Sequence, residues 1–211
     1  EHVAWLADRG VRTISPLGTT GEGPSLSLDE RKAVIERLAA HRAGMRLLPG
    51  TGCTALPETI ELSRFAVEHG AAGILVAPPW YYDATPAGTA RYFGAVIEAL
   101  PADARVFLYH IPAQTGVPIE DETIRELRDR YGPDTVIVVS ATYMSNTTVY
   151  GETTQQIVAE RNAAGDDQIR YWYFDNTGLD YNGCHWHPSV KDHQLISERL
   201  YDYLTSLKLD W

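Results

Sequence analysis

Short apolar runs alternate along the chain with longer amphipathic stretches, a pattern typical of βα units around a parallel sheet. Continuously apolar runs such as Gly73–Ala77 and Thr135–Val139 indicate strands that helices cover on both faces. The pattern predicts six strands, at Val11–Pro16, Arg46–Thr51, Gly73–Pro78, Arg105–Tyr109, Thr135–Ser140 and Ile169–Phe174.

Two helix starts are marked by capping residues. Ser27 followed by Glu30 is the pattern of a capping box, in which each side chain satisfies an otherwise unpaired backbone N–H, and it predicts a helix over Asp29–His41. Thr85 followed by Pro86 predicts a second start, because a proline loses nothing by lacking its N–H at the first helical position.

The sequence also predicts two helix ends and a helix near each end of the chain. Gly70 and Gly132 stand where helix ends need a positive φ. A helix over His2–Arg9 is predicted before any strand, which is unusual for a βα protein. A last helix is predicted from His187 and Pro188 to about Leu207.

The charge balance narrows the classes of partner. Eighteen Lys and Arg against 28 Asp and Glu give a net charge of −10, which repels nucleic acid and anionic membranes and favours small ligands. Cys53 and Cys184 are too few for a disulfide framework. No apolar run approaches the roughly 20 residues that cross a bilayer, and no export signal is recognisable. We therefore expect a cytoplasmic protein, monomeric or homodimeric, that needs no cofactor.

The composition changes abruptly near Asp134. Residues 1–134 hold 11 of the 12 prolines and no asparagine, whereas residues 135–211 hold one proline and all four asparagines. Because βα units continue on both sides of this boundary, we interpret residues 1–211 as a single hybrid α/β domain that joins segments 1–134 and 135–211.

Three motifs follow predicted strands in the first segment. They are Gly18–Pro24 (GTTGEGP), Pro78–Tyr82 (PPWYY) and Tyr109–Gly116 (YHIPAQTG). From His2 to about Pro133 the chain resembles the dihydrodipicolinate synthase and N-acetylneuraminate lyase family of Schiff-base aldolases. The resemblance implies a (βα)8 barrel that holds a keto acid at the carboxyl ends of its strands.

The resemblance also implies roles for individual residues. Thr19 and Thr20 would bind the carboxylate of a small keto acid, and Thr20 would relay protons with Tyr109. Tyr82, or its neighbour Tyr81, would be contributed to the substrate site of a neighbouring subunit. Without the family, the GTTG stretch is a tight turn able to accommodate an anion, and the tyrosines are half-buried aromatics with a hydroxyl at the rim.

A Schiff-base aldolase also needs a desolvated lysine at a strand end, because its amine condenses with the substrate carbonyl. The three lysines, Lys32, Lys191 and Lys208, all fall in predicted helices or in the tail. Ser140 stands approximately where the family has its lysine, and a serine hydroxyl cannot form an imine. Gln114 occupies the place of a carboxylate-binding arginine of the synthases.

The second segment contains a histidine-rich stretch, Asn182–His193 (NGCHWHPSVKDH). It is similar to the carboxyl-terminal block of SGNH-type carbohydrate acetyl esterases, which implies that His187 is a general base. The Gly-Asp-Ser nucleophile motif of that superfamily is absent, and Cys184 replaces its usual carboxylate. The spacing of Cys184, His185, His187 and His193 matches no standard zinc pattern, so we expect no metal.

These observations lead to one prediction of fold and one of function. Six strands are too few to close an eight-stranded barrel, so we predict an open, flavodoxin-like α/β/α sandwich, with a partial or composite barrel as the alternative. We predict an engineered chimeric scaffold without retained catalysis, because the imine lysine and the esterase nucleophile are both missing. The alternatives are a residual Schiff-base lyase acting on 2-keto acids, or a weak acetyl esterase using His187.

Overall fold

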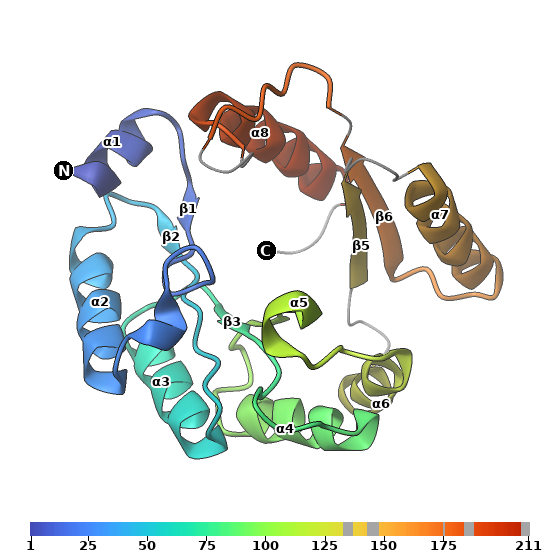
Figure 1. Cartoon of the computed structure of the whole chain (residues 1–211), viewed down its shortest axis with the longest axis horizontal. Coiled ribbons are helices and arrows are strands. Elements are labelled where there is room, and N and C mark those ends of the chain that lie inside the picture. Colours follow the sequence, from blue (N-terminus) through green and yellow to red (C-terminus); the bar gives the residue numbers. More distant parts are fainter. Residues whose placement is uncertain (133–136, 143–147, 175, 184–187, 208–211) are drawn as a thin grey trace. The chain divides into compact units, whose positions relative to one another are not determined.

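The computed structural model describes residues 1–132, 137–142, 148–174, 176–183 and 188–207 (Figure 1). The chain divides into two compact units, Glu1–Arg130 and Tyr131–Trp211, which are described separately below. The single-domain organisation expected for residues 1–211 stays a prediction.

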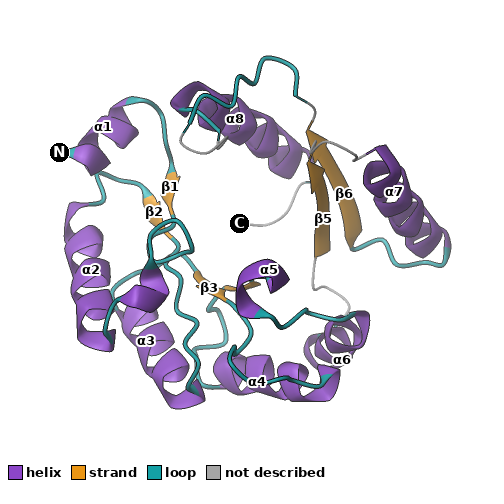
Figure 2. Ribbon diagram, in the orientation of Figure 1, coloured by secondary structure: helices purple, strands orange, loops and turns teal. Residues whose placement is uncertain are grey.

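The first unit alternates short strands with helices, as the apolar pattern predicts (Figure 2). Its strands are β1 (Thr13–Ile14), β2 (Arg46–Leu47), β3 (Ile74–Val76) and β4 (Val106–Leu108). Its helices are α1 (His2–Asp8), the 3-10 turn η1 (Gly23–Ser25), α2 (Leu28–His41), α3 (Leu56–Glu68), α4 (Pro86–Glu98), α5 (Pro112–Thr115) and α6 (Asp121–Tyr131).

Each strand of this unit neighbours the next strand along the chain. β1 pairs in parallel with β2, and β3 pairs in parallel with β4. A parallel bridge between Gly50 and Leu75 joins the continuation of β2 to β3. A flavodoxin-like sheet would instead place β1 between β2 and β3. The predicted six-stranded flavodoxin-like sandwich is therefore not confirmed, and the sequential order is the one found in a (βα)8 barrel.

Helices α2, α3 and α4 stand side by side and bury one continuous core against the strands. Ile35, Leu62 and Phe93 from these helices, with Leu47 and Ile74 from the strands, are fully buried. Ile74 and Val76 of the predicted run Gly73–Ala77 are thus in the core, which positions the loop that follows β3.

The predicted helix caps of this unit are confirmed. Ser27 Oγ accepts a hydrogen bond from the Glu30 N–H, and Glu30 Oε2 accepts one from the Ser27 N–H, which is the reciprocal pattern of a capping box. The Gly88 N–H donates to Thr85 Oγ1 at the start of α4. Gly70, after α3, has φ 75° as expected of a helix end.

The second unit contains β5 (Ile137–Thr142), α7 (Thr148–Ala163), β6 (Ile169–Phe174) and α8 (Val190–Ser206). β5 and β6 pair in parallel, α7 packs against both strands, and α8 packs against β6. Within the described residues, no helix has the length and apolar character needed to cross a membrane.

The last helix begins two residues later than its Pro188 start signal suggests. The Asp192 N–H donates to Ser189 Oγ, and the Ser189 N–H donates to Asp192 Oδ2, so Ser189 is the residue that caps α8. The buried Asp192 carboxylate also accepts hydrogen bonds from the N–H groups of Asp180 and Tyr181. One carboxylate thus fixes both the helix start and the preceding loop.

Candidate active site

The loop after β1 has a backbone conformation that side chains rarely adopt. Leu17 has φ 64° and Glu22 has φ 49°. A Cβ atom at Gly23 would lie 2.2 Å from the Leu17 carbonyl oxygen, and one at Gly50 would lie 2.5 Å from the same oxygen. Both positions therefore require glycine, and together they hold the start of the Gly18–Gly21 turn at the carboxyl end of β1.

This turn forms one wall of a pocket of about 310 Å³. Its lining comes from the loops after β1, β2, β3 and β4, the edge at which ligand sites of parallel α/β proteins lie. The lining residues are Leu17, Gly18, Thr19, Glu22, Pro24, Ser25, Gly50, Gly52, Leu75, Ala77, Trp80, Tyr109, Ile111, Gln114 and Thr115. We call it the Thr19–Tyr109 pocket.

Two hydroxyl groups far apart in the sequence meet in this pocket. Thr19 Oγ1 and the Tyr109 hydroxyl lie 3.4 Å apart, and either can donate. Tyr109 directly follows β4, and its N–H donates to the Val76 carbonyl oxygen at 2.8 Å, which fixes its backbone at the end of the strand pair. The pair can pass a proton between a bound molecule and solvent, because a hydroxyl both donates and accepts.

Other residues predicted for the site lie elsewhere. Thr20 is exposed in the same turn but does not line the Thr19–Tyr109 pocket. Tyr82 is 76% exposed and stacks edge-on against Tyr81, whose φ of 90° is unusual for a tyrosine. Neither tyrosine lines the pocket of its own chain.

The predicted esterase residue His187 and most of the Cys and His residues near it lie outside the described part of the chain. His187, Cys184 and His185 lie outside the described residues, so the proposed general base stays a prediction. Within the described residues, no three His, Cys, Asp or Glu side chains are grouped to hold a metal ion.

A buried polar layer lies beneath the pocket. The Cys53 N–H donates to Thr59 Oγ1 at 2.9 Å, and Thr59 Oγ1 lies 2.8 Å from the Tyr92 hydroxyl. Burial raises the pKa of the Cys53 thiol, partly offset by Arg31, and burial raises the pKa of Tyr92 to about 12. Both groups therefore stay protonated near neutral pH.

Arg31 also belongs to this layer, and the sequence analysis did not single it out. Its side chain is only 4% exposed. The residue spacing along α2 indicates this burial. Arg31 shares one face of the helix with Leu28, Ile35 and Leu38 at three- and four-residue spacing. An arginine inside an apolar stripe is expected to be buried, and a buried arginine needs specific partners.

Lys32, the lysine of the first unit, does not line the Thr19–Tyr109 pocket. Lys32, on α2, forms an ion pair with Glu61. Lys191, on α8, lies 3.9 Å from Asp180 Oδ2, and Lys208 lies outside the described residues. Ser140 is on β5 with its backbone paired to Trp172.

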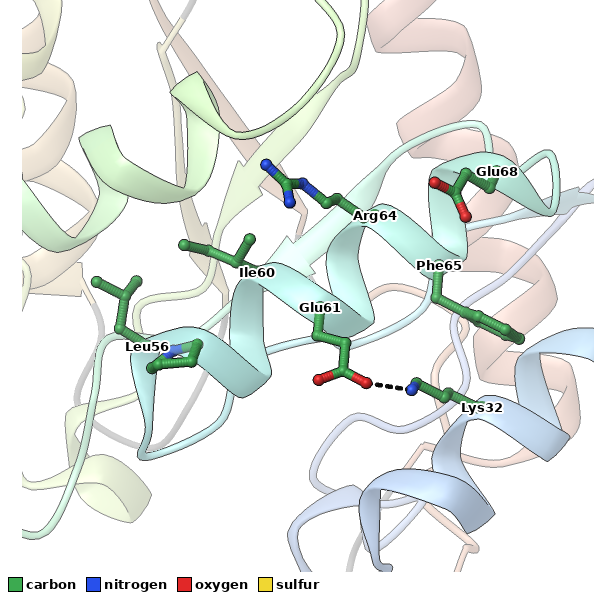
Figure 3. Close-up of a pocket in the computed structure, with 8 residues that line it drawn as sticks. Lys32, Leu56, Ile60, Glu61, Arg64, Phe65 and Glu68 are labelled. Atoms are coloured by element: carbon green, nitrogen blue, oxygen red, sulfur yellow. Dashed lines mark hydrogen bonds and ion pairs between the residues drawn. The ribbon is translucent and has the colours of Figure 1, made fainter.

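A second, wider hollow of about 680 Å³ lies over α2 and α3 (Figure 3). Figure 3 shows Lys32 of α2 reaching toward Glu61 of α3, while Arg64 points away from this pair. Arg64 Nε donates to the Ala99 carbonyl oxygen. Three of the charged groups that line this hollow thus bind one another or backbone, and none of the residues predicted to be functional lines it.

The sequence profile of the Dihydrodipicolinate synthetase family matches residues 1–169. The chain belongs to this family. An uncharacterised DapA-like lyase of Chloroflexus aurantiacus is 48% identical over 132 residues, which are 62% of this chain and 44% of that protein. The 4-hydroxy-tetrahydrodipicolinate synthase of Methanocaldococcus jannaschii is 36% identical over 62% of this chain and 45% of its own. This family member thus spans less than half the length of the curated relatives it matches.

The fold agrees with the family. The crystal structure of YagE, a prophage protein of the dihydrodipicolinic acid synthase family from E. coli K12 in complex with pyruvate, aligns with a TM-score of 0.66 at 26% identity. The alignment covers 97% of this chain and 70% of that one.

Two predictions are corrected by these comparisons. The match continues to residue 169, well past the compositional change at residue 134, so that change does not mark the end of the family sequence. The predicted scaffold without catalysis is wrong, because the named relatives are a lyase and a synthase of one enzyme family. The relatives named here also give no support to the esterase resemblance or to a chimera.

Proposed function

We propose that this chain acts as a lyase on 2-keto acids and binds the keto acid in the Thr19–Tyr109 pocket. One observation carries the proposal: two hydroxyls that are 90 residues apart meet 3.4 Å from each other at the carboxyl ends of β1 and β4. The pyruvate complex of YagE agrees with such a ligand, and the name of the Chloroflexus relative, a lyase, agrees with the activity.

Within this proposal each residue has a distinct role. Backbone N–H groups of the Gly18–Gly21 turn bind the carboxylate, as glycine-rich turns do for anions. Thr19 hydrogen-bonds the ligand and passes protons with Tyr109. The relay role that the resemblance implies for Thr20 stays a prediction, because Thr20 does not line the pocket. Tyr82 serves the pocket of a second copy, which agrees with its exposure in its own chain.

The bond-making step needs an amine that forms an imine with the keto group, with loss of water. Among the described residues lining the pocket there is no lysine. Binding of the keto acid and imine formation are therefore measured separately.

Binding is measured by calorimetry with pyruvate, for the wild-type chain, Tyr109→Phe, Thr19→Val and the control Tyr173→Phe in the other unit. We expect the first two variants to bind more weakly and the control to bind normally. Equal affinity in all four proteins, or no binding at all, would refute the proposed pocket.

Imine formation is measured by reduction with borohydride in the presence of pyruvate, followed by mass spectrometry of the intact chain and of its peptides. A covalent adduct on one of the three lysines supports the lyase. If pyruvate binds but borohydride traps nothing, the lyase part of the proposal fails while the binding part stands.

A further inference from the structure

Arg31 lies directly behind the floor of the Thr19–Tyr109 pocket. Its Nη2 donates to the carbonyl oxygens of Gly50 and Gly52, each at 3.0 Å. Its Nη1 donates to Cys53 Sγ, also at 3.0 Å. Gly50 and Gly52 line the pocket, so one guanidinium ties helix α2 to the segment that forms the pocket floor.

The positive charge of this guanidinium is poorly compensated. Arginine keeps its proton in proteins, and a buried charge is costly unless it is paired. Among the described residues, no carboxylate lies within ion-pair distance of Arg31, and its Nε is buried without a hydrogen-bond partner. Glu58 interacts electrostatically with Cys53, which neighbours Arg31, but Glu58 is exposed and its charge is screened by solvent. It therefore compensates the Arg31 charge poorly.

The pocket lining does not itself supply a positive charge. Its described residues include one carboxylate, Glu22, and no lysine, arginine or histidine. A keto acid carries a negative charge, so Glu22 disfavours it. The Arg31 charge lies one hydrogen bond behind the floor, in a region of low dielectric where its field reaches the pocket.

We propose that Arg31 is a positioning residue of this pocket with two effects. It clamps the Gly50–Cys53 segment in place, and its charge makes the pocket selective for an anionic ligand over a neutral one of the same shape. The inference rests on the proposed function, because the anion it concerns is the carboxylate of the keto acid.

The test compares pyruvate with methyl pyruvate, its neutral ester, by calorimetry. The variants are Arg31→Gln, which removes the charge, and Arg31→Lys, which keeps the charge but not the fork of donors. Arg64→Gln is the control, because it changes the net charge equally and Arg64 binds only a surface carbonyl near the other hollow.

For Arg31→Gln we expect pyruvate to bind on the order of tenfold more weakly, as removal of a charge at this range predicts, while the ester changes far less. Arg31→Lys should keep the preference for pyruvate. Arg64→Gln should bind both ligands like the wild type. If Arg31→Gln weakens the binding of pyruvate and of methyl pyruvate equally, or weakens neither, the proposed electrostatic effect of Arg31 is refuted.

Hydrogen exchange of the Gly50–Cys53 segment tests the clamp without any ligand. We expect faster exchange there in both Arg31 variants than in Arg64→Gln, and unchanged exchange would overturn the clamp. If the wild-type chain binds neither pyruvate nor its ester, the proposed function and the electrostatic effect both fail, and the exchange experiment still decides the clamp.

Discussion

The close contact between Gly50 and Leu17 makes a quantitative prediction for Gly50→Ala. The added Cβ would lie 2.5 Å from the Leu17 carbonyl oxygen, whereas ordinary contact begins at 3.4 Å, so the two backbones must separate by 3.4 − 2.5 = 0.9 Å. Leu17 cannot easily retreat, because its oxygen lies even closer, 2.2 Å, to the Cβ position of Gly23 and its φ is already 64°.

Overpacking of this kind costs about 1–3 kcal/mol. Alanine also reduces the conformational entropy of the unfolded chain, which stabilises the folded state by about 0.4–1 kcal/mol and offsets part of this cost. The free energy of unfolding of the first unit should therefore fall by about 1–2 kcal/mol. Because the displaced Leu17–Gly18 peptide carries the turn with Thr19, pyruvate binding should weaken as well.

Native-state hydrogen exchange of core amides in α3 and α4 measures this loss unit by unit, which a global melting curve of a chain with two units does not. Gly18→Ala is the matched control for stability, because a Cβ at Gly18 meets nothing within 4 Å and needs no positive φ. If Gly50→Ala is as stable as Gly18→Ala, the close contact between Gly50 and Leu17 does not constrain the loop.

Two further predictions concern the helix caps. Ser27→Ala removes the hydroxyl that accepts from the Glu30 N–H but keeps the backbone N–H that donates to Glu30 Oε2. It should lower the opening free energy of α2 amides by about 1 kcal/mol, with α7 amides unchanged as the internal control. Burial alone would raise the pKa of Asp192, but hydrogen bonds from the N–H groups of Ser189, Asp180 and Tyr181 lower it from 3.8 to about 2. Its stabilising effect on the second unit is therefore complete above about pH 4 and is lost as the pH falls toward 2. Asp192→Asn should be less stable at neutral pH and should lose less on acidification, and equal acid sensitivity in both proteins would contradict this account.

The local parts of the fold were predictable because their causes are local. The capping box at Ser27 and the buried strand around Ile74 depend on residues within a few positions of each other, and the structure confirms both. The order of the strands was not predictable in this way. The bridge between Gly50 and Leu75 depends on tertiary packing, and βα periodicity is the same in a barrel and in a flavodoxin-like sheet.

The candidate site was predictable only in part. Thr19 and Tyr109 were singled out by their motifs, but their contact joins residues 90 positions apart and no periodicity indicates it. Arg31 was not singled out, although its position among Leu28 and Ile35 indicates the core. The spacing of a charged residue on a helix was here more informative than its charge.

The wrong prediction of function came from treating two requirements as one. In the proposed function, recognition of a keto acid depends on the turn around Thr19, on Tyr109 and on the glycine contacts that hold the turn, and residues 1–132 contain all of these. Imine formation depends on an amine, which is a separate group at a separate strand end. The absence of a lysine at Ser140 bears only on the second requirement. Pyruvate binding and borohydride trapping therefore test different parts of the molecule, and a chain that passes the first and fails the second would still have a keto-acid site.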